Sequence, residues 1–205
     1  MRESVSDLSS AGSSPAPDSE ALARFRDQLQ FVEADVHQYI ERRLSPRLRR
    51  RVDASDVLQE TLLLACRAYA DFERRRPMPF RTWLLKTAQQ QLIQVRRFHL
   101  QSQRRSVGRE VGDDHSTALL HASLALSAST PSRNLMRAEA QQSVVAALNR
   151  LAEIDREILF MREFEKRPYE EIADICEIDA AAARKRFGRA LLRLRLELKA
   201  AGLLE

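Results

Sequence analysis

Two segments of this chain concentrate positive charge in patterns that suit binding to a polyanion. Residues 80–105 carry six Lys or Arg and no Asp or Glu, and residues 184–195 carry another six with no acid between them. Apolar residues recur at steps of three and four through the first segment, which predicts an amphipathic helix with a cationic face. Its amides, Gln89 and Gln90 among them, suit exposed bases beside a phosphate backbone. We therefore expect two separate contacts with nucleic acid.

The sequence shows no residue pattern typical of an enzyme. It contains no pairing of a nucleophile with a base, no cluster with metal-ligand spacing and no glycine-rich phosphate loop. No catalytic residue, metal site or cofactor is predicted. Cys66 and Cys176 lie far apart in the sequence and are expected to be reduced thiols in helices, with a redox switch or a disulfide as the alternative.

The composition is that of an all-α protein that can form real hydrophobic cores. Leu, Ala, Arg, Glu and Gln dominate, Gly occurs only five times, and 44% of the residues are hydrophobic. No apolar run approaches the roughly 18 residues that a membrane helix needs. The N-terminus lacks the basic and then apolar pattern of a signal peptide. We expect no membrane insertion.

Shifts in composition divide the chain into two small helical domains. Residues 1–18 are rich in Ser, Pro, Ala and Gly, and predict a disordered tail. Residues 19–105 are expected to form the first helical domain, and residues 135–205 the second. Residues 106–134 differ in composition from both and predict a flexible linker.

Within the first domain, periodicity and helix-breaking residues predict three helices. The first covers residues 19–44. The second is opened by Asp53 as its N-cap and runs to about Phe72. Two prolines make residues 73–79 a loop, and the basic helix of residues 80–105 follows it.

The end of the second domain has the spacing of a helix-turn-helix. Residues 169–176 predict a short helix, residues 177–179 a turn, and Asp179 the N-cap of a second helix. That second helix fits the major groove of DNA, where Arg and Lys reach guanine edges and phosphates. The alternative is a solvated, charged helix in a plain bundle. Helices are expected at about residues 135–151, 154–164, 169–176 and 180–200, and the exposed cations of the last one are Arg184, Lys185, Arg186 and Arg189.

Two sets of motifs, in this order, resemble the sigma-70 family of RNA polymerase initiation factors. Residues 53–61 (DASDVLQET), residues 80–84 (FRTWL) and the acid-free helix are similar to region 2 of the extracytoplasmic-function (ECF) group. Residues 148–196, with YEEIA and RKRFGRAL, are similar to region 4 of the same group. The TPS element at residues 130–132 resembles ECF factors of planctomycete type.

The resemblance implies a protein without enzymatic activity that works as a subunit of bacterial core RNA polymerase. Region 2 would bind the clamp helices of the β′ subunit and open the −10 element, while region 4 would bind duplex −35 DNA and the β flap. It also implies a cytoplasmic location and an anti-sigma factor as a further possible partner. The positions that match the polymerase-binding motif are Asp56, Gln59 and Glu60, for which a merely solvated acidic face is the alternative.

The resemblance also assigns residues to the −10 and −35 elements. The loop of residues 71–79 matches the family loop that captures a flipped base, an event that costs a few kcal/mol and needs neutralised phosphates. Trp83 would stack on a base, although a helical Trp beside Leu84 is more often part of the core. The residues assigned to −35 DNA are Arg184, Lys185, Arg186 and Arg189. Those assigned to −10 DNA are Arg74, Arg75, Arg76, Phe80, Arg81, Trp83, Lys86, Gln89, Gln90, Arg96 and Arg97.

Several positions depart from the family pattern. Glu177 stands near the turn position where ECF factors often have Gly, and the second helix starts with four Ala at residues 180–183, which offer no side-chain hydrogen bonds. Gly188 replaces a larger residue, and three Gln at residues 89–91 occur where Asn is common. We expect weak base discrimination and a large share of phosphate contacts.

Two other functions remain open on the sequence alone. One is a helix-turn-helix repressor or activator that binds DNA without polymerase. The other is a sigma-like adaptor or sequestering protein that binds polymerase and does not open promoters.

Overall fold

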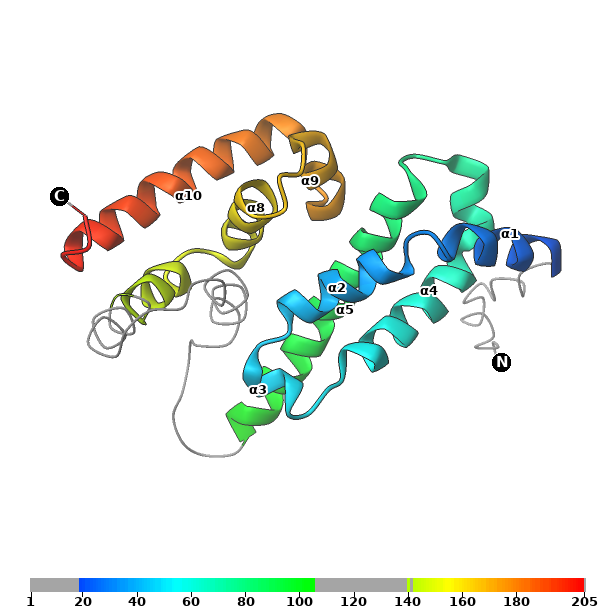
Figure 1. Cartoon of the computed structure of the whole chain (residues 1–205), viewed down its shortest axis with the longest axis horizontal. Helices are drawn as coiled ribbons and strands as arrows, with labels where there is room; N and C mark the ends of the chain where they lie inside the picture. The colour runs from blue at the N-terminus through cyan, green and yellow to red at the C-terminus, as the bar shows by residue number, and fades with distance from the viewer. Residues whose placement is uncertain (1–18, 106–139, 141, 205) are drawn as a thin grey trace, which may run out of the picture.

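The structure is a computed structural model that describes residues 19–105, 140 and 142–204. All regular elements within these residues are helices, which confirms the predicted all-α class (Figure 1). The predicted tail (residues 1–18) and the predicted linker (residues 106–134) lie outside the described residues. None of the described helices is both long enough and apolar enough to cross a membrane.

The N-terminal bundle consists of α1 (Ser19–Leu29), α2 (Glu33–Arg43), α3 (Pro46–Arg49), α4 (Ala54–Arg75) and α5 (Phe80–Arg105). The long helices α4 and α5 pack on each other, α2 lies against both, and α1 lies on α4 (Figure 1). The bounds of α5 are those predicted from the sequence.

The prediction of one continuous helix over residues 19–44 is wrong. At Val32 the backbone leaves helical geometry (φ −125°, ψ −10°), and its N–H donates to the carbonyl of Leu29 at 2.9 Å. This tight turn separates α1 from α2, so that α1 buries Phe25 against α4 while α2 packs between α4 and α5. The short α3, capped by the Ser45 side chain, was also not predicted.

The N-cap predicted for α4 is confirmed, while its C-terminal end lies three residues beyond the predicted one. The Asp53 carboxylate accepts from the N–H of Ser55 at 3.0 Å. The helix continues through Arg75 and ends where Arg76 adopts a left-handed conformation (φ 39°). The loop between α4 and α5 is therefore shorter than the predicted residues 73–79.

The C-terminal bundle consists of residues 142–149, which are helical, and of α8 (Glu153–Glu163), α9 (Tyr169–Cys176) and α10 (Ala180–Ala200). Helices α8, α9 and α10 pack on one another. Asp179 caps α10, as predicted, by accepting from the N–H of Ala182 at 2.7 Å. The helix expected at residues 135–151 begins in residues that the structure does not describe.

The two bundles share one hydrophobic core. Ile172 and Ile175 of α9 are fully buried in the same cluster as Leu84 and Leu85 of α5, and Met161 of α8 belongs to it as well. Helix α9 packs directly on α5. The sequence did not indicate this contact, because the apolar periodicity of a helix shows which face is buried and does not show which helix covers it.

Candidate nucleic-acid interfaces

One polar face of α4 carries the three residues that the sequence assigned to polymerase. Asp56, Gln59 and Glu60 are all exposed, while Val57 and Leu58 are buried in the bundle. This face continues into an apolar patch that the sequence analysis missed. Leu63 is 53% exposed and Leu64 37% exposed. The available signal was the run of three leucines at residues 62–64, which is longer than a buried helical stripe requires.

The end of α4 presents three guanidinium groups to solvent. The side chains of Arg74, Arg75 and Arg76 are about 70% exposed. Asp71 pairs with Arg74 and with Arg75, the latter at 3.2 Å. These exposed pairs are weak and exchange readily with other anions. The cluster is thus positioned to neutralise phosphates.

Trp83 packs into an aromatic group between α4 and α5. Its ring stacks on Phe72 with the centroids 4.3 Å apart and the planes 16° from parallel. Phe80 contacts the same group and meets Phe25 edge-on at 5.7 Å. This packing favours the core interpretation of Trp83 over stacking on a base. Phe80 likewise has a packing role in this structure.

The basic helix α5 does not present one free cationic face. Gln90 and Arg97 are exposed, whereas Gln89 is buried and its Oε1 accepts from the Tyr39 hydroxyl at 2.9 Å. The other three assigned cations pair with acids of the C-terminal bundle. Arg81 forms an ion pair with Glu171 at 3.0 Å, Lys86 with Glu177 at 2.9 Å, and Arg96 with Glu153 at 2.7 Å. Arg81 also pairs with Asp35 of α2 at 2.9 Å.

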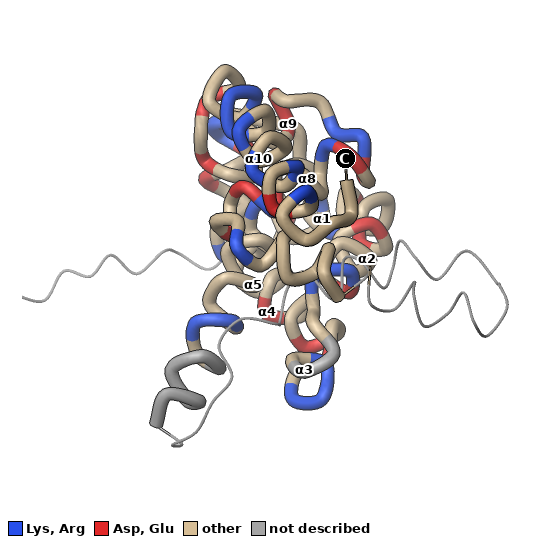
Figure 2. The backbone as a smooth tube through the Cα atoms, turned by 90° about the vertical axis from the view of Figure 1, so that its left-hand side faces the viewer, with Lys and Arg blue, Asp and Glu red and all other residues tan. Residues whose placement is uncertain are grey.

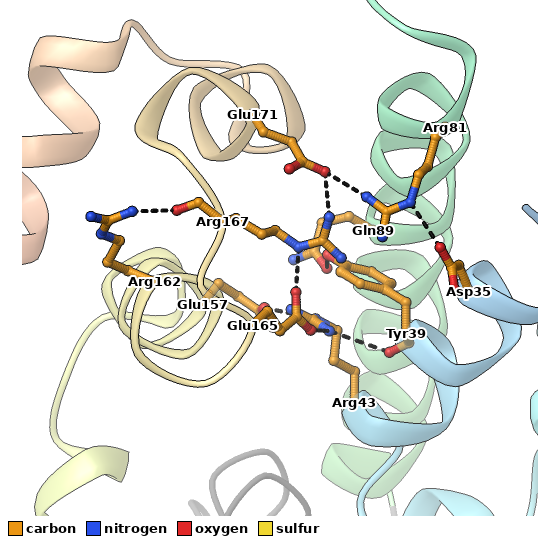
Figure 3. A network of polar contacts seen from close by, with 10 residues as sticks. All are labelled: Asp35, Tyr39, Arg43, Arg81, Gln89, Glu157, Arg162, Glu165, Arg167 and Glu171. Atoms are coloured by element: carbon orange, nitrogen blue, oxygen red, sulfur yellow. Dashed lines mark hydrogen bonds and ion pairs between the residues drawn. The ribbon is translucent and has the colours of Figure 1, made fainter.

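A buried network of charged groups lies beside these pairs (Figure 3). Arg43, which is completely buried at the end of α2, bonds to Glu157 at 2.9 Å and to Glu165 at 2.8 Å. Its guanidinium lies 3.5 Å from the centre of the Tyr39 ring. Arg167 bonds to Glu165 as well. Arg43 was not predicted as a functional residue, because its sequence context is that of an ordinary cation in the last turn of a helix.

The second helix of the helix-turn-helix, α10, exposes three of its four assigned cations. Arg184, Lys185 and Arg189 are exposed, and the blue segments of α10 in Figure 2 show the concentration of charge on this helix. Arg186 is instead half-buried and bonds to Asp155 at 3.0 Å, which ties α10 to α8. An added Cβ at Gly188 would meet no atom within 4 Å, so this position lies in open space.

The C-terminal half of α10 carries an apolar stripe. Leu192 and Leu196 are both 60% exposed, and Leu191 is 40% exposed. The exposure of these three leucines was not predicted from the sequence. Exposed leucines one turn apart on a surface helix are typical of a protein contact.

The described residues offer no alternative chemistry at these surfaces. Among them, no group of three His, Cys, Asp or Glu is arranged to hold a metal ion. Cys66 and Cys176 are free thiols. Burial raises the pKa of Cys176 to about 12, which keeps this thiol protonated and unreactive near neutral pH.

Comparison with known proteins gives matches over both bundles. The family model described as Sigma-70 region 2 matches residues 32–105, and the one described as Sigma-70, region 4 matches residues 141–194. The RNA polymerase sigma-H factor of Pseudomonas aeruginosa is 32% identical over 143 residues, which are 67% of this chain and 69% of that protein.

Solved structures show a similar fold. The sigma factor RpoE, in complex with the anti-sigma factor NepR from Bartonella quintana, aligns with a TM-score of 0.54 and 23% identity, over 86% of this chain and 97% of that one. CnrH in complex with the cytosolic domain of CnrY aligns with a TM-score of 0.47 and 19% identity, over 89% of this chain and 90% of that one.

Proposed function

This chain belongs to the sigma-70 family, and we propose that it is an ECF-type sigma factor that recruits core RNA polymerase to −35/−10 promoters and promotes strand opening. A role as a sigma factor follows from the family, and so does the absence of enzymatic activity. The ECF type is supported by the motifs of the two regions and by the fold that the chain shares with RpoE.

The observation that carries the proposal is that two exposed polar surfaces of different charge lie on different bundles, one on α4 and one on α10. Helix α4 presents an acidic and amide face ending in exposed leucines. Helix α10 presents Arg184, Lys185 and Arg189 at a helix-turn-helix. An acidic face has no use on DNA, since it repels phosphate, but it suits a basic protein partner. The cationic face suits duplex phosphates and guanine edges.

In this proposal α4 binds the β′ clamp helices through Asp56, Gln59 and Glu60. Leu63 and Leu64 supply the apolar centre that a protein contact needs beside its polar rim. The leucine stripe of α10 is the corresponding candidate for the β flap. Promoter DNA is the second partner, bound through α5 and α10. We place the protein with polymerase in the bacterial cytoplasm.

Strand opening would use the end of α4 and the start of α5. The exposed cluster of Arg74, Arg75 and Arg76 is suited to hold the backbone around an unstacked base, whose extrusion costs a few kcal/mol. Trp83 and Phe80 pack against the aromatic group between α4 and α5. In this proposal they therefore hold the connection between these two helices in place and do not stack on the base.

An anti-sigma factor is a further proposed partner. The solved RpoE structure of similar fold is a complex with such a protein. The exposed leucines of α4 and α10 are proposed contacts with polymerase. A regulator that binds these leucines would therefore block polymerase binding.

Reconstitution with sigma-free bacterial core polymerase on a genomic DNA library tests the proposal. We expect transcripts with defined starts, whose upstream sequences share −35 and −10 elements. A stand-alone helix-turn-helix regulator would shift duplex DNA without polymerase. An adaptor would copurify with core polymerase and yield no transcripts. Either result would replace the proposed function.

A further inference from the structure

The contact between the two bundles covers the cations of α5 that the sequence assigned to −10 DNA. Arg81, Lys86 and Arg96 were all assigned to −10 DNA, and each one forms an ion pair with a carboxylate of the C-terminal bundle. Carboxylate oxygens thus occupy the places where phosphate oxygens would bind. We propose that the free chain holds a closed, self-inhibited state, in which acids of the C-terminal bundle occupy the DNA-binding cations of α5. The inference rests on the proposed function for its biological meaning.

Glu177 supports this assignment because of its backbone conformation. It occupies the left-handed region (φ 57°, ψ 43°) at the end of α9, where glycine is the favoured residue. A glutamate there accepts a strained backbone and brings its carboxylate to within 2.9 Å of the Lys86 amine. The hydrogen bond from Lys86 lowers the pKa of Glu177, so the acid is charged when the pair forms.

Arg43 holds the two bundles together beneath these pairs. Its side chain is fully buried, and both of its carboxylate partners, Glu157 and Glu165, belong to the other bundle (Figure 3). A buried cation is costly unless it is paired, so the arrangement requires both bundles to stay in contact. Apolar side chains of α9 and α5 add to the same contact.

The contact between the two bundles nevertheless has features that allow it to open. A polar cavity of about 320 Å³ lies along it, lined by residues of α2, the start of α5 and the segment from Phe164 to Glu171. The outer carboxylates remain close to solvent, with Glu153 47% exposed and Glu177 55% exposed. The cations are less exposed than their acids, with Lys86 at 25% and Arg96 at 9%, so DNA phosphates reach these cations only when the bundles separate.

The two DNA surfaces differ in their access in the closed state. Arg184, Lys185 and Arg189 of α10 stay exposed, while the three cations of α5 are occupied. The free chain therefore offers its duplex-binding face and withholds its face for single strands. Binding of core polymerase to α4 and α10 would draw the bundles apart and release α5.

Carbodiimide cross-linking of the free, full-length protein tests for the closed state. This reagent joins an amine to a carboxylate in direct contact, so mass spectrometry should find Lys86 linked to Glu177. Lys166 and Glu163, which are 3.7 Å apart within the C-terminal bundle, provide the internal control. Finding the control link without the Lys86–Glu177 link would overturn the inference. Substitution Arg43→Met should abolish the Lys86–Glu177 link and retain the control link.

Binding of a fluorescent, mixed-sequence single-stranded oligonucleotide to the free chain tests for inhibition. Glu153→Gln with Glu177→Gln removes two acids that face α5. Glu163→Gln with Glu170→Gln removes two exposed acids elsewhere in the same bundle, and so makes the same change in net charge. We expect the first pair to raise the affinity several-fold more than the second. Equal gains would overturn the inhibitory role, provided that circular dichroism shows both variants to be equally helical.

These measurements separate the inference from the proposed function. The cross-linking and the oligonucleotide binding both use the free chain. A failure to bind polymerase would overturn the proposed function, but it would not affect the results of these two experiments. Adding core polymerase and promoter DNA should reduce the Lys86–Glu177 link and leave the control link unchanged. A link that persists in initiating complexes would show that separation is not required, and would overturn the inference.

Discussion

Arg43 and Glu157 join the two halves of this chain across 114 residues of sequence. The Arg43 Nε and the Glu157 Oε2 are 2.9 Å apart, and the two side chains are 0% and 1% exposed. Glu165 bonds to the same guanidinium, so one cation is shared by two acids. In a low-dielectric interior, this arrangement is stable only when all its members are present.

The first prediction concerns the removal of this cation. We expect Arg43→Met to lower the free energy of unfolding by about 3 kcal/mol, because two buried carboxylates lose their partner. Urea denaturation followed by circular dichroism measures the change. Arg24→Met is the control, since it removes an exposed pair with Glu73 inside the N-terminal bundle. A loss no larger than that of the control would show that the buried pair does not stabilise the contact.

The second prediction concerns pH. Burial by itself would raise the pKa of Glu165, but the charge and the hydrogen bond of Arg43, together with Arg167, lower it below the ordinary 4.5. The stability from this carboxylate is therefore present above the ordinary value, and is lost as the pH falls through the lowered pKa. Urea midpoints between about pH 3 and pH 6 should fall with acid. In Glu165→Gln this fall should be shallower, and an unchanged slope would contradict the assignment.

The third prediction concerns the binding of core polymerase. We expect Asp56→Arg with Glu60→Arg to abolish copurification with core polymerase, because both residues lie on the exposed face of α4. Changes of exposed charge usually cost little stability, so the fold should be retained. Circular dichroism checks the fold. Glu33→Arg with Glu170→Arg provides a charge-matched control on other exposed positions. Undiminished binding by the α4 variant would remove this face from the polymerase contact.

The fourth prediction concerns the glycine within α10. Gly188→Ala should raise the free energy of unfolding by about 1 kcal/mol, since alanine favours the helix and the added Cβ meets nothing within 4 Å. Thermal unfolding of the variant and the unmodified chain measures this change in stability. Because the position lies in open space, duplex DNA binding should change little. A destabilised variant would mean that another group approaches this face.

Local patterns in the sequence predicted the ends of helices well where prolines or capping residues mark them. Two prolines and an acid-free stretch set the start of α5, and Asp53 and Asp179 were recognised as caps. The break at Val32 was not predicted, because the apolar spacing continues through it. Exposed positions such as Arg184 were predicted from helical phase alone.

The contact between the bundles was beyond reach of the same reasoning. Arg43 and its partners are separated by more than a hundred residues, and nothing in the local window marks them. For the same reason, the sequence could not show that Arg81, Lys86 and Arg96 are paired across the contact. A cation bound to an acid and a cation bound to solvent look alike in sequence.

The last prediction separates the two positive helices by their action on promoter DNA. Arg184 and Lys185 lie exposed on the helix that we propose binds duplex DNA. Arg184→Ala with Lys185→Ala should therefore weaken closed-complex formation, by about 1–3 kcal/mol for each lost base contact. A promoter pre-melted across the −10 element should not rescue this defect. Replacing Arg74, Arg75 and Arg76 by Ala should instead impair opening, and the pre-melted promoter should partly restore it.

Gel shifts and permanganate footprinting of the holoenzyme, on matched and pre-melted templates, measure both effects. The three arginines at the end of α4 are exposed. Arg74 and Arg75 pair with Asp71, and Arg76 lies 3.9 Å from Glu73, so these pairs are all at the surface and their loss should leave the fold of α4 unchanged. Arg67→Ala, an exposed substitution elsewhere on α4, is the control and should behave as the unmodified chain. Duplex docking precedes melting, so a bubble can replace only the later step. If the pre-melted template rescues the α10 variant and not the Arg74, Arg75 and Arg76 variant, the roles of the two surfaces are reversed.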